Sequence, residues 1–335
     1  MRKVTVKDIA FHLGVSPATV SHALANRPKV ALKTRLRVQE AAAAMSYVPN
    51  RVAQSMRHSQ SNTIGIVVPS VRDSFFSEIV DGIEQEAKEV GTQCFLCQTH
   101  NSSEKLIAEV DALLSHMVKG VIIHPHSVDD DTGLFASLSR RGPNLVLLGQ
   151  QVRGISAPLV KNDERRIGKL ATEHLLQKGH KQIAWINGNQ KHTAVHGRYQ
   201  GYQDALTEAG IITSKELEAS GGFEEESGYL AAEVLLARRV KLTAVVAPND
   251  FAALGAVRRF TRAGYRIPQD VAVIGCGNLD FGSLMTPTLS TIDQFPFELG
   301  RAAFQLLTED KSTTPLRTIS IDSKVVERES TNKNL

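Results

Sequence analysis

Short apolar runs alternate with amphipathic stretches along most of this chain, beginning near residue 62. Ile64 to Val68 is a continuous apolar run of strand length, whereas Ser74 to Val90 repeats its apolar residues at helical spacing. Consecutive parallel strands need a crossover connection, and an amphipathic helix is the usual one. The alternation therefore predicts an α/β fold with doubly wound parallel sheets.

The alternation begins again at Asp163, which predicts a second, similar lobe and a cleft between the two. We expect strands at 64–68, 93–97, 120–124, 145–148, 182–186, 244–246 and 271–274, and helices at 74–90, 103–117, 163–178, 199–209, 227–238 and 251–263. In open α/β sheets, ligands bind outside the carboxyl ends of the strands. The loops expected to line the cleft therefore follow Val68, His124, Ile186, Val246 and Ile274.

The first residues have a different pattern, because Thr5 to Asn26 contains two short amphipathic stretches around Gly14. Thr5 and Asp8 have the spacing of an N-terminal capping pair, and Ser16 followed by Pro17 suits the start of a second helix. This arrangement predicts a helix-turn-helix, whose second helix enters the major groove of DNA. An ordinary helical hairpin is the alternative.

Positive charge is concentrated in residues 1–60, which hold ten lysine or arginine residues and two acidic residues. The formal charge of this segment is +8, so the remaining residues carry −4 within a chain whose total is +4. A basic segment on a mildly acidic body is expected when one module neutralises DNA phosphates. A third helix, expected from Leu32 to Met45, would complete the core of this segment, although Ala31 offers no side-chain oxygen to cap it.

With 335 residues and 42% apolar content, the chain is long enough for two or more folding units with buried cores. Its apolar runs are too short to span a membrane, and its first residues lack the apolar region of a signal peptide. The three cysteines are too few for a disulfide framework and suit a reducing compartment. We therefore expect a cytoplasmic protein with no membrane partner.

The segment from Thr5 through Val68 carries the motifs TVKDIA, GVS-x-x-TVS, TR-x-RV, Y-x-PN-x-x-A and S-x-TIG-x-x-VP, in this order. In these motifs the chain resembles the lactose-repressor (LacI/GalR) family of bacterial transcription regulators, and the resemblance continues over nearly the whole chain. It implies a three-helix helix-turn-helix head at 1–48 and a hinge helix and linker at 49–61. It also implies a two-lobed, periplasmic-binding-protein-like (type I) core, with an N-terminal lobe at 62–161 plus 293–322 and a C-terminal lobe at 162–292 plus 323–335.

The resemblance implies that the hinge segment folds into a helix on operator DNA, where paired helices of a dimer enter the minor groove. Met56 stands where relatives usually have the leucine that opens a base step, and methionine is itself an apolar wedge. His22 stands where arginine is common, so base preference there is expected to differ. The DNA-contacting residues that the family implies are Thr5, Ser16, Pro17, Ala18, Thr19, Ser21, His22, Thr34, Asn50, Ala53, Met56 and Arg57.

In the core, the resemblance implies an effector site made by Phe75, Phe76, Arg198, Asn249, Asp250 and Asn278. One phenylalanine of the family pair stacks on a flat ligand, with Phe76 the favoured one, and the arginine forks onto ligand hydroxyls or carboxylates. The Asn–Asp pair reaches the ligand or the hydrogen-bond network between the lobes. Read without the family, the same residues are core packing, a surface arginine and a helix cap.

One position departs from the family pattern. Relatives carry G-Y/F-D-D/N after the strand that ends at Ile274, and the first aspartate often holds sugar hydroxyls. This chain has Gly275, Cys276, Gly277 and Asn278, so that carboxylate is missing. Substitution by Asn278, an unusual ligand, a phosphorylated sugar and a weakened response are all open explanations.

An enzyme is the least favoured alternative, because its signals are weak. The stretch GCGNLDFG fails the G-x-G-x-x-G pattern at its third glycine, and no P-loop, HExxH or nucleophile elbow is present. Cys94 and Cys97 have zinc-like spacing, but residues three apart on a strand point to opposite faces, so a buried pair of small apolar side chains is expected. We expect no cofactor and no metal. A stand-alone sugar-binding protein, the second alternative, is disfavoured by the basic head and the missing signal peptide.

These features together predict a ligand-responsive, sequence-specific DNA-binding regulator, a repressor of a carbohydrate-utilisation operon. Its expected partners are pseudo-palindromic operator DNA, a second copy of the chain, and an effector that is a sugar or sugar phosphate, with a purine as the less favoured class. A homodimer is favoured over a tetramer because no heptad-patterned helix follows Glu329. Effector binding is expected to shift the population of lobe arrangements and thereby the folding of the hinge on DNA.

Overall fold

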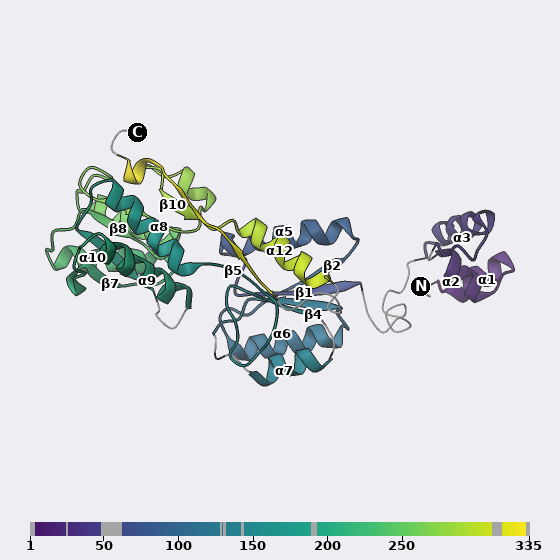
Figure 1. The fold of residues 1–335 in the computed structure, drawn as a ribbon. Coiled ribbons are helices and arrows are strands. Elements are labelled where there is room, and N and C mark those ends of the chain that lie inside the picture. The colour runs from purple at the N-terminus through teal and green to yellow at the C-terminus, as the bar shows by residue number, and fades with distance from the viewer. Residues whose placement is uncertain are drawn as a thin grey trace. The chain divides into compact units, whose positions relative to one another are not determined.

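The structure, a computed structural model, describes residues 4–24, 26–47, 62–127, 129, 132–141, 144–188, 193–309 and 317–332. The chain divides into two compact units, Met1–Ser61 and Asn62–Leu335. Figure 1 shows that the first unit is helical and that the second is built of sheets covered by helices. Within the described ranges, no helix combines the length and the apolar character that a membrane span requires.

The described part of the first unit, residues 4–24 and 26–47, is a bundle of the helices α1 (Val6–Leu13), α2 (Pro17–Leu24) and α3 (Leu32–Ala44). Thr5 and Asp8 form a capping box at the start of α1, in which Asp8 N–H donates to Thr5 Oγ1 and Thr5 N–H donates to Asp8 Oδ2. Gly14 ends this helix with a φ of +66°, a left-handed conformation that favours glycine. Each helix contributes to the buried core, which includes Ile9, Val20 and Val38. The expected helix-turn-helix is confirmed, as is the missing side-chain cap at Ala31.

The second unit begins with a six-stranded parallel sheet in the order β11-β5-β4-β3-β1-β2. Its strands are β1 (Thr63–Val68), β2 (Gln93–Gln98), β3 (Gly120–Ile123), β4 (Asn144–Leu148), β5 (Leu159–Asn162) and β11 (Thr318–Ile321). Figure 1 shows α5 (Ser74–Glu89) and α12 (Pro296–Thr308) on one face of the sheet, and α6 (Ser103–Ser115) and α7 (Thr132–Arg141) on the other. Because both faces are covered, the central strand β1 is buried at every position.

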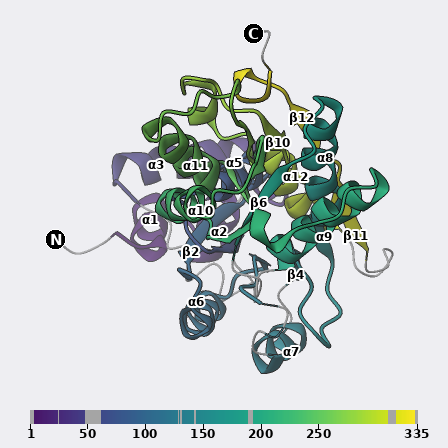
Figure 2. The same ribbon diagram turned by 90° about the vertical axis from the view of Figure 1, so that its left-hand side faces the viewer.

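A second parallel sheet has four strands in the order β7-β6-β8-β9. Its strands are β6 (Ile183–Asn187), β7 (Glu218–Ser220), β8 (Ala244–Val246) and β9 (Ala272–Ile274). One face packs against α8 (Glu164–Gln177) and α9 (Thr193–Glu208), and the other against α10 (Glu225–Ala237) and α11 (Asp250–Arg262), as Figure 2 shows. Short 3-10 helices are η1 (Lys215–Leu217), η2 (Asp280–Ser283) and η3 (Glu329–Thr331). The unit therefore contains two lobes of the same doubly wound design, as predicted.

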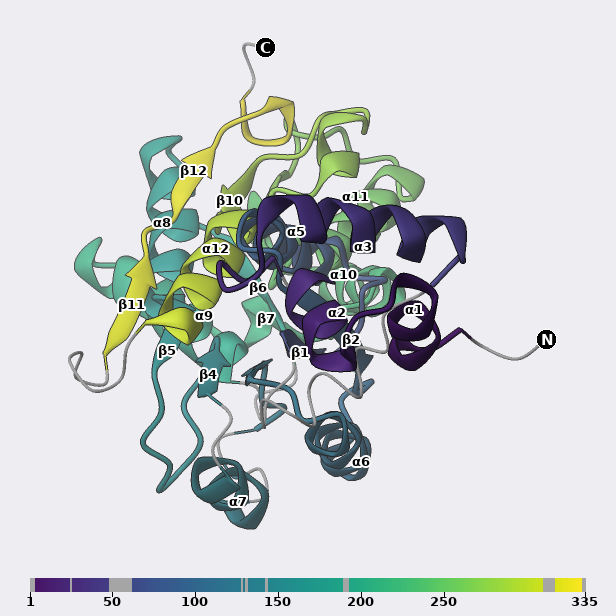
Figure 3. The same ribbon diagram turned by 90° about the vertical axis from the view of Figure 1, so that its right-hand side faces the viewer.

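The chain passes between the lobes after β5, between β10 (Thr291–Asp293) and α12, and between β11 and β12 (Lys324–Val326). The last of these passages is visible in Figure 3. Strands β10 and β12 pair antiparallel next to the passages. The buried Asn162 Nδ2 donates to Gln294 O at 3.0 Å and to Ile321 O at 2.9 Å. One side chain therefore joins all three passages.

The expected helices and strands are all present, and their bounds agree with the structure to within two residues except at α9. This helix begins at Thr193 rather than at Tyr199. The sequence pattern did not predict its first turns because they include Gly197 and exposed polar side chains, which obscure the helical period of apolar residues. The apolar pattern did not predict the helices α7 and α12 or the strands β5, β7, β10, β11 and β12. The family resemblance did place the returning strands correctly, since β10 ends at Asp293 and β12 begins just after Ser323.

The two cysteines of the edge strand β2 point to opposite faces, as predicted. Cys94 packs with the cluster under α5 and α12, and Cys97 packs with the cluster under α6. Both are half-buried rather than buried, because β2 lies at the edge of the sheet. Burial raises the pKa of Cys94 to about 11 and that of Cys97 to about 12, so both thiols are protonated at neutral pH.

Glycines hold three pairs of helices in close contact. A Cβ atom at Gly168 on α8 would lie 1.8 Å from Arg198 O on α9, and one at Gly201 would lie 1.9 Å from Arg165 O. The same reciprocal arrangement joins two further pairs, α10 and α11 through Gly228 and Gly255, and α5 and α12 through Gly82 and Gly300. Because the opposing atoms belong to the backbone, rotation of a side chain cannot relieve these contacts. The approach of α8 to α9 therefore requires glycine at Gly168.

We expect Gly168→Ala to lower the free energy of unfolding by about 1–3 kcal/mol, because the added methyl group must push α8 away from α9. Denaturant unfolding followed by circular dichroism measures the change. Gln177→Ala, at an exposed position of the same helix, is the control and should change stability by less than about 0.5 kcal/mol. Equal stability of the two variants would contradict the close contact.

A network of buried hydrogen bonds connects the C-terminal residues Ser330 and Thr331 to α8. His174 Nε2 lies 2.8 Å from Thr331 Oγ1, which lies 2.7 Å from Ser290 Oγ. Ser290 N–H in turn donates to Ser330 Oγ at 2.8 Å. Burial lowers the pKa of His174, although the negative charge of Glu327 opposes this effect. The folded protein therefore favours the neutral imidazole.

We expect stability to decline as the pH falls below the ordinary histidine pKa of 6.5. In that range the unfolded chain binds a proton at His174 and the folded protein resists it, so acid favours unfolding, whereas this contribution is complete at higher pH. His174→Gln should show a weaker loss of stability between roughly pH 7.5 and pH 5.5. Denaturant titrations at both pH values measure the difference, with the exposed His116→Gln as control. Identical pH dependence in His174→Gln and the parent protein would refute the assignment.

Candidate functional site

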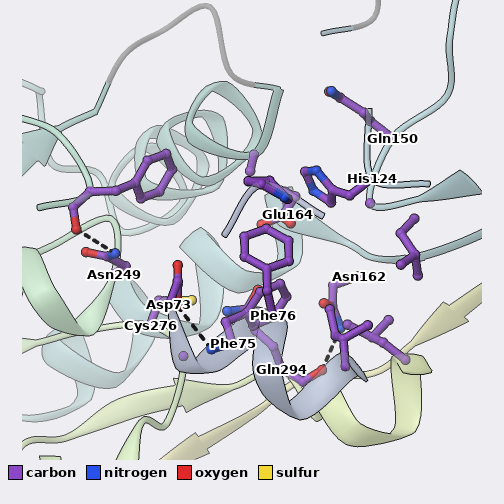
Figure 4. A pocket seen from close by; sticks show the side chains of 18 of the residues that line it. Asp73, Phe75, Phe76, His124, Gln150, Asn162, Glu164, Asn249, Cys276 and Gln294 are labelled. Carbon is purple, nitrogen blue, oxygen red and sulfur yellow. Dashed lines mark hydrogen bonds between the residues drawn. The ribbon is translucent and has the colours of Figure 1, made fainter. Parts of the chain in front are cut away.

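A cavity of about 240 Å³ lies between the two lobes of the second unit. Its walls include loops at the carboxyl ends of β1, β3, β4, β8 and β9 and the first turns of α5 and α9. These loops include the ones expected after Val68, His124, Val246 and Ile274. Figure 4 shows side chains from both lobes around this space. The volume is below the roughly 300–1,000 Å³ of pockets for drug-sized ligands, so the cavity suits a small molecule.

Aromatic side chains form the apolar part of the cavity. Phe75 and Phe76, in the first turn of α5, both line it, and their rings meet edge to face with centroids 5.2 Å apart. Phe76 also packs edge-on against His124, at 4.9 Å between centroids. Phe223, from the other lobe, lines the cavity too. Flat ring faces from both lobes are therefore available to the apolar face of a ligand.

Arg198 on α9 lines the cavity but is itself buried. Its Nε donates to Glu164 Oε2 at 2.7 Å and its Nη2 to Gln294 Oε1 at 2.9 Å, while Nη1 donates to Pro248 O. Gln294 is the residue whose carbonyl oxygen accepts from Asn162. The guanidinium therefore connects the cavity wall to the passages between the lobes.

Asn249 lines the cavity and caps α11, as the sequence predicts for a capping residue. Its Oδ1 accepts from Ala252 N–H at 2.9 Å, and its Nδ2 donates to Phe223 O at 2.8 Å. The side chain thereby holds the loop that presents Phe223.

Asp250 and Asn278 do not line the cavity, in contrast to the placement expected for effector-contacting residues. Asp250 is fully buried, and its oxygens accept from Leu279 N–H at 2.8 Å and from the Thr291 hydroxyl at 2.6 Å. Burial raises the pKa of Asp250 to about 6. Asn278 is bonded away from the cavity, through Nδ2 to Asp293 Oδ2 at 3.2 Å. Both side chains support the wall behind the cavity.

The two glycines after β9 have different structural causes. A Cβ atom at Gly275 would lie 2.2 Å from Asp250 Oδ1, so a side chain there would displace the carboxylate. Gly277 lines the cavity with a φ of +139°, a backbone conformation that side chains rarely adopt. The backbone conformation at Gly277 therefore favours glycine over the aspartate that relatives carry at this position.

Several polar residues of the cavity were not predicted from the sequence, namely Asp73, Asn162, Glu164, Glu224 and Gln294. Asp73 caps α5 by accepting from Phe75 N–H at 3.0 Å. Aspartate is a preferred N-cap residue, so its position just before an expected helix could have predicted this role. Asn162 is the last residue of β5, and Gln294 lies between β10 and α12. The apolar pattern predicted none of these three elements. No local signal placed these two at the cleft.

In the helical head, the predicted DNA contacts cluster on α2. Ser16 caps this helix, accepting from Thr19 N–H at 3.0 Å. Thr5 caps α1, and Thr34 lies in the first turn of α3. The exposed members are Thr5, Ser16, Pro17 and Ala18, and the half-buried members are Thr19, Ser21, His22 and Thr34. The remaining predicted contacts, Asn50, Ala53, Met56 and Arg57, lie outside the described residues.

Both units match known family models. Residues 5–50 match the model of bacterial regulatory proteins of the lacI family, and residues 61–329 match that of periplasmic binding proteins and the sugar binding domain of the LacI family. The chain belongs to the LacI family. The resemblance seen in the sequence motifs and the predicted fold are thereby confirmed.

Individual relatives agree with this assignment. The HTH-type transcriptional repressor PurR of Mannheimia succiniciproducens is 34% identical over 332 residues, covering 98% of this chain and 99% of the relative. A lac repressor dimer bound to operator and the anti-inducer ONPF has a TM-score of 0.88 and 28% identity, covering 98% of this chain and 99% of that chain. A CelR–cellobiose complex has a TM-score of 0.73 and 29% identity, covering 98% and 100%.

Membership in the LacI family decides the general function. The chain is a ligand-responsive, DNA-binding transcriptional repressor and not an enzyme. The lac repressor structure is a dimer bound to operator DNA and to a small molecule, and the CelR structure holds cellobiose.

Proposed function

We propose that this LacI-family repressor controls a carbohydrate-utilisation operon and that a small sugar in the interlobe cavity sets its affinity for the operator. The observation that carries the proposal is the cavity, in which the rings of Phe75, Phe76 and Phe223 lie beside polar groups from both lobes. Aromatic faces suit the apolar face of a sugar ring, and polar groups around them suit its hydroxyls. The cellobiose complex of the similar CelR regulator supports a carbohydrate ligand.

The effector is proposed to act by population shift. A ligand that contacts both lobes stabilises one arrangement of the lobes over the other, by as much as its affinities for the two differ. The three chain passages that Asn162 joins are the segments about which the lobes would move. Arg198 connects these passages to the cavity, because it donates to Gln294. The proposed parts are the head at 1–48, the hinge helix at 49–61, the N-terminal lobe at 62–161 plus 293–322, and the C-terminal lobe at 162–292 plus 323–335.

On DNA, each head of the dimer is proposed to read one half-site. Pro17, Ala18 and His22 would meet base edges from α2 in the major groove, while hydroxyl side chains on and around the helix ends bind phosphates. Met56 would act as the minor-groove wedge of the hinge helix. We propose that the protein acts in the cytoplasm, because the operator DNA that it would bind is found there.

A gel-shift titration on DNA from the chain's own promoter region, with and without a panel of neutral sugars, tests the proposal. We expect a specific shift that one sugar alters. A specific shift that no sugar alters would remove the carbohydrate assignment. Absence of any specific shift would overturn the regulatory role on that DNA.

Arg198→Ala should leave operator affinity unchanged and lower sugar affinity by more than about tenfold, or ~1.4 kcal/mol. The variant leaves Glu164 without its partner and cuts the connection from the cavity to Gln294. Gel shifts and calorimetry measure the two affinities. Arg165→Ala, which removes an exposed ion pair to Asp204, is the control and should respond normally. A normal response in Arg198→Ala would show that the effector acts elsewhere.

Met56→Gly should weaken operator binding by about tenfold or more, because the hinge loses both its apolar wedge and helix propensity. Sugar affinity should not change, since the hinge segment precedes the lobes that form the cavity. Met56→Leu keeps an apolar wedge and should keep operator affinity. Parallel calorimetry checks the sugar site, and loss of sugar binding in Met56→Gly would mean that hinge and cavity are not separable.

A further inference from the structure

We infer that Asp73 and Glu224, one from each lobe, form the acceptor pair of the effector cavity and select a ligand that donates hydrogen bonds and carries no negative charge. The inference rests on the proposed function and refines its ligand. A neutral or amino-bearing sugar fits this pair, whereas a sugar phosphate does not.

Both carboxylates line the cavity from opposite lobes. Asp73 stands at the start of α5, beside the phenylalanine pair, as Figure 4 shows. Its Oδ1 accepts from Phe75 N–H, which leaves the second carboxylate oxygen for a ligand. Glu224 stands at the cap position of α10 but forms no side-chain cap hydrogen bond. Each carboxylate therefore has oxygen atoms that do not accept hydrogen bonds from the backbone of its own helix.

The two carboxylates lie close enough to influence one another. Burial raises the pKa of Asp73, and the negative charge of Glu224 raises it further. Closure of the lobes with no donor group between the two carboxylates would bring these like charges together at an electrostatic cost. Hydroxyl or ammonium groups placed between them would donate to both and offset that cost. A donor ligand would therefore favour closure of the lobes.

The other charged residues of the cavity compensate for the pair only in part, since the positive charge of Arg198 lowers the pKa of Asp73 less than the negative charge of Glu224 raises it. Arg198 is already matched by Glu164, to which its Nε donates at 2.7 Å. When Arg198 and Glu164 are set aside as a pair, the aspartate, glutamate and lysine residues that line the cavity are Asp73, Glu224 and Lys161. Their formal charges sum to −1. A phosphate ester would add about −1.5 to −2 charges at pH 7. The site is therefore built to repel an anion, which removes a phosphorylated sugar as the explanation for the glycine at Gly277.

Calorimetry on the full chain with matched ligands tests the inference. The ligand sets are D-ribose with D-ribose 5-phosphate, D-glucose with D-glucosamine and D-glucose 6-phosphate, and D-galactose with D-galactosamine and D-galactose 6-phosphate, with adenine and guanine as uncharged bases. We expect at least one neutral or amino sugar to bind, and its phosphate ester to bind at least about tenfold more weakly.

Asp73→Asn and Glu224→Gln should each lower the affinity for the bound sugar by about tenfold or more and narrow the gap to its phosphate ester, because hydrogen bonds to charged groups are the stronger ones. Asparagine is itself a good helix cap, so Asp73→Asn keeps the cap of α5. Matched controls are Asp163→Asn, which changes the cap of α8 outside the cavity, and Glu226→Gln in the first turn of α10. Both controls should bind the sugar as the parent protein does.

A phosphate ester that binds as tightly as its parent sugar would overturn the inference. So would full sugar affinity in both Asp73→Asn and Glu224→Gln, or no binding by any sugar or base of the panel. An uncharged base that binds with the same dependence on the pair would support the pair and remove the carbohydrate assignment. Gel shifts distinguish failure of this inference from failure of the proposed repressor function. If a phosphate ester releases the operator, the acceptor pair is refuted but the repressor function is not.

Discussion

The structure of the core depends on how three chain segments pass between its lobes. The buried Asn162 amide donates to backbone carbonyl oxygens of the other two passages, at Gln294 and Ile321. An unsatisfied buried carbonyl group costs about 1–3 kcal/mol, so this one side chain stabilises the passages as a group. Lobes joined in this way can change their mutual arrangement with little change inside each lobe, which is what ligand-driven population shift requires.

The cavity depends on the passages and on helix packing together. Gly168 lets α8 approach the backbone of Arg198, and this approach helps to set where the guanidinium meets Glu164 and Gln294. The arginine is thus committed to the protein's own groups before any ligand arrives. Its charge is matched internally, so the uncompensated charges of the cavity are those of other residues. This arrangement explains why the presence of an arginine does not by itself predict an anionic ligand.

The departure of this chain from its relatives at Gly277 has a local physical cause. Asp250 fills the space behind the strand end, Gly275 makes room for it, and the backbone at Gly277 takes a conformation suited to glycine. Asp250 is held by a backbone N–H and a hydroxyl rather than by a ligand. The wall is therefore stable without a carboxylate facing the cavity, and its acceptors come from other positions.

The sequence by itself determined the helix-turn-helix, the alternation of strands and helices, the family, and the placement of Phe75, Phe76, Arg198 and Asn249 at the cleft. These features depend on local capping, periodicity and motif spacing. The sequence did not reveal that Asp250 is buried behind the cavity wall or that Asn162 and Gln294 join the passages between the lobes. It also did not reveal that Glu164 neutralises the charge of Arg198. Only the tertiary structure decided these, because each depends on contacts between residues far apart in the chain, such as the 132 positions between Asn162 and Gln294. Local patterns carry no information about which distant backbone groups a buried side chain will meet.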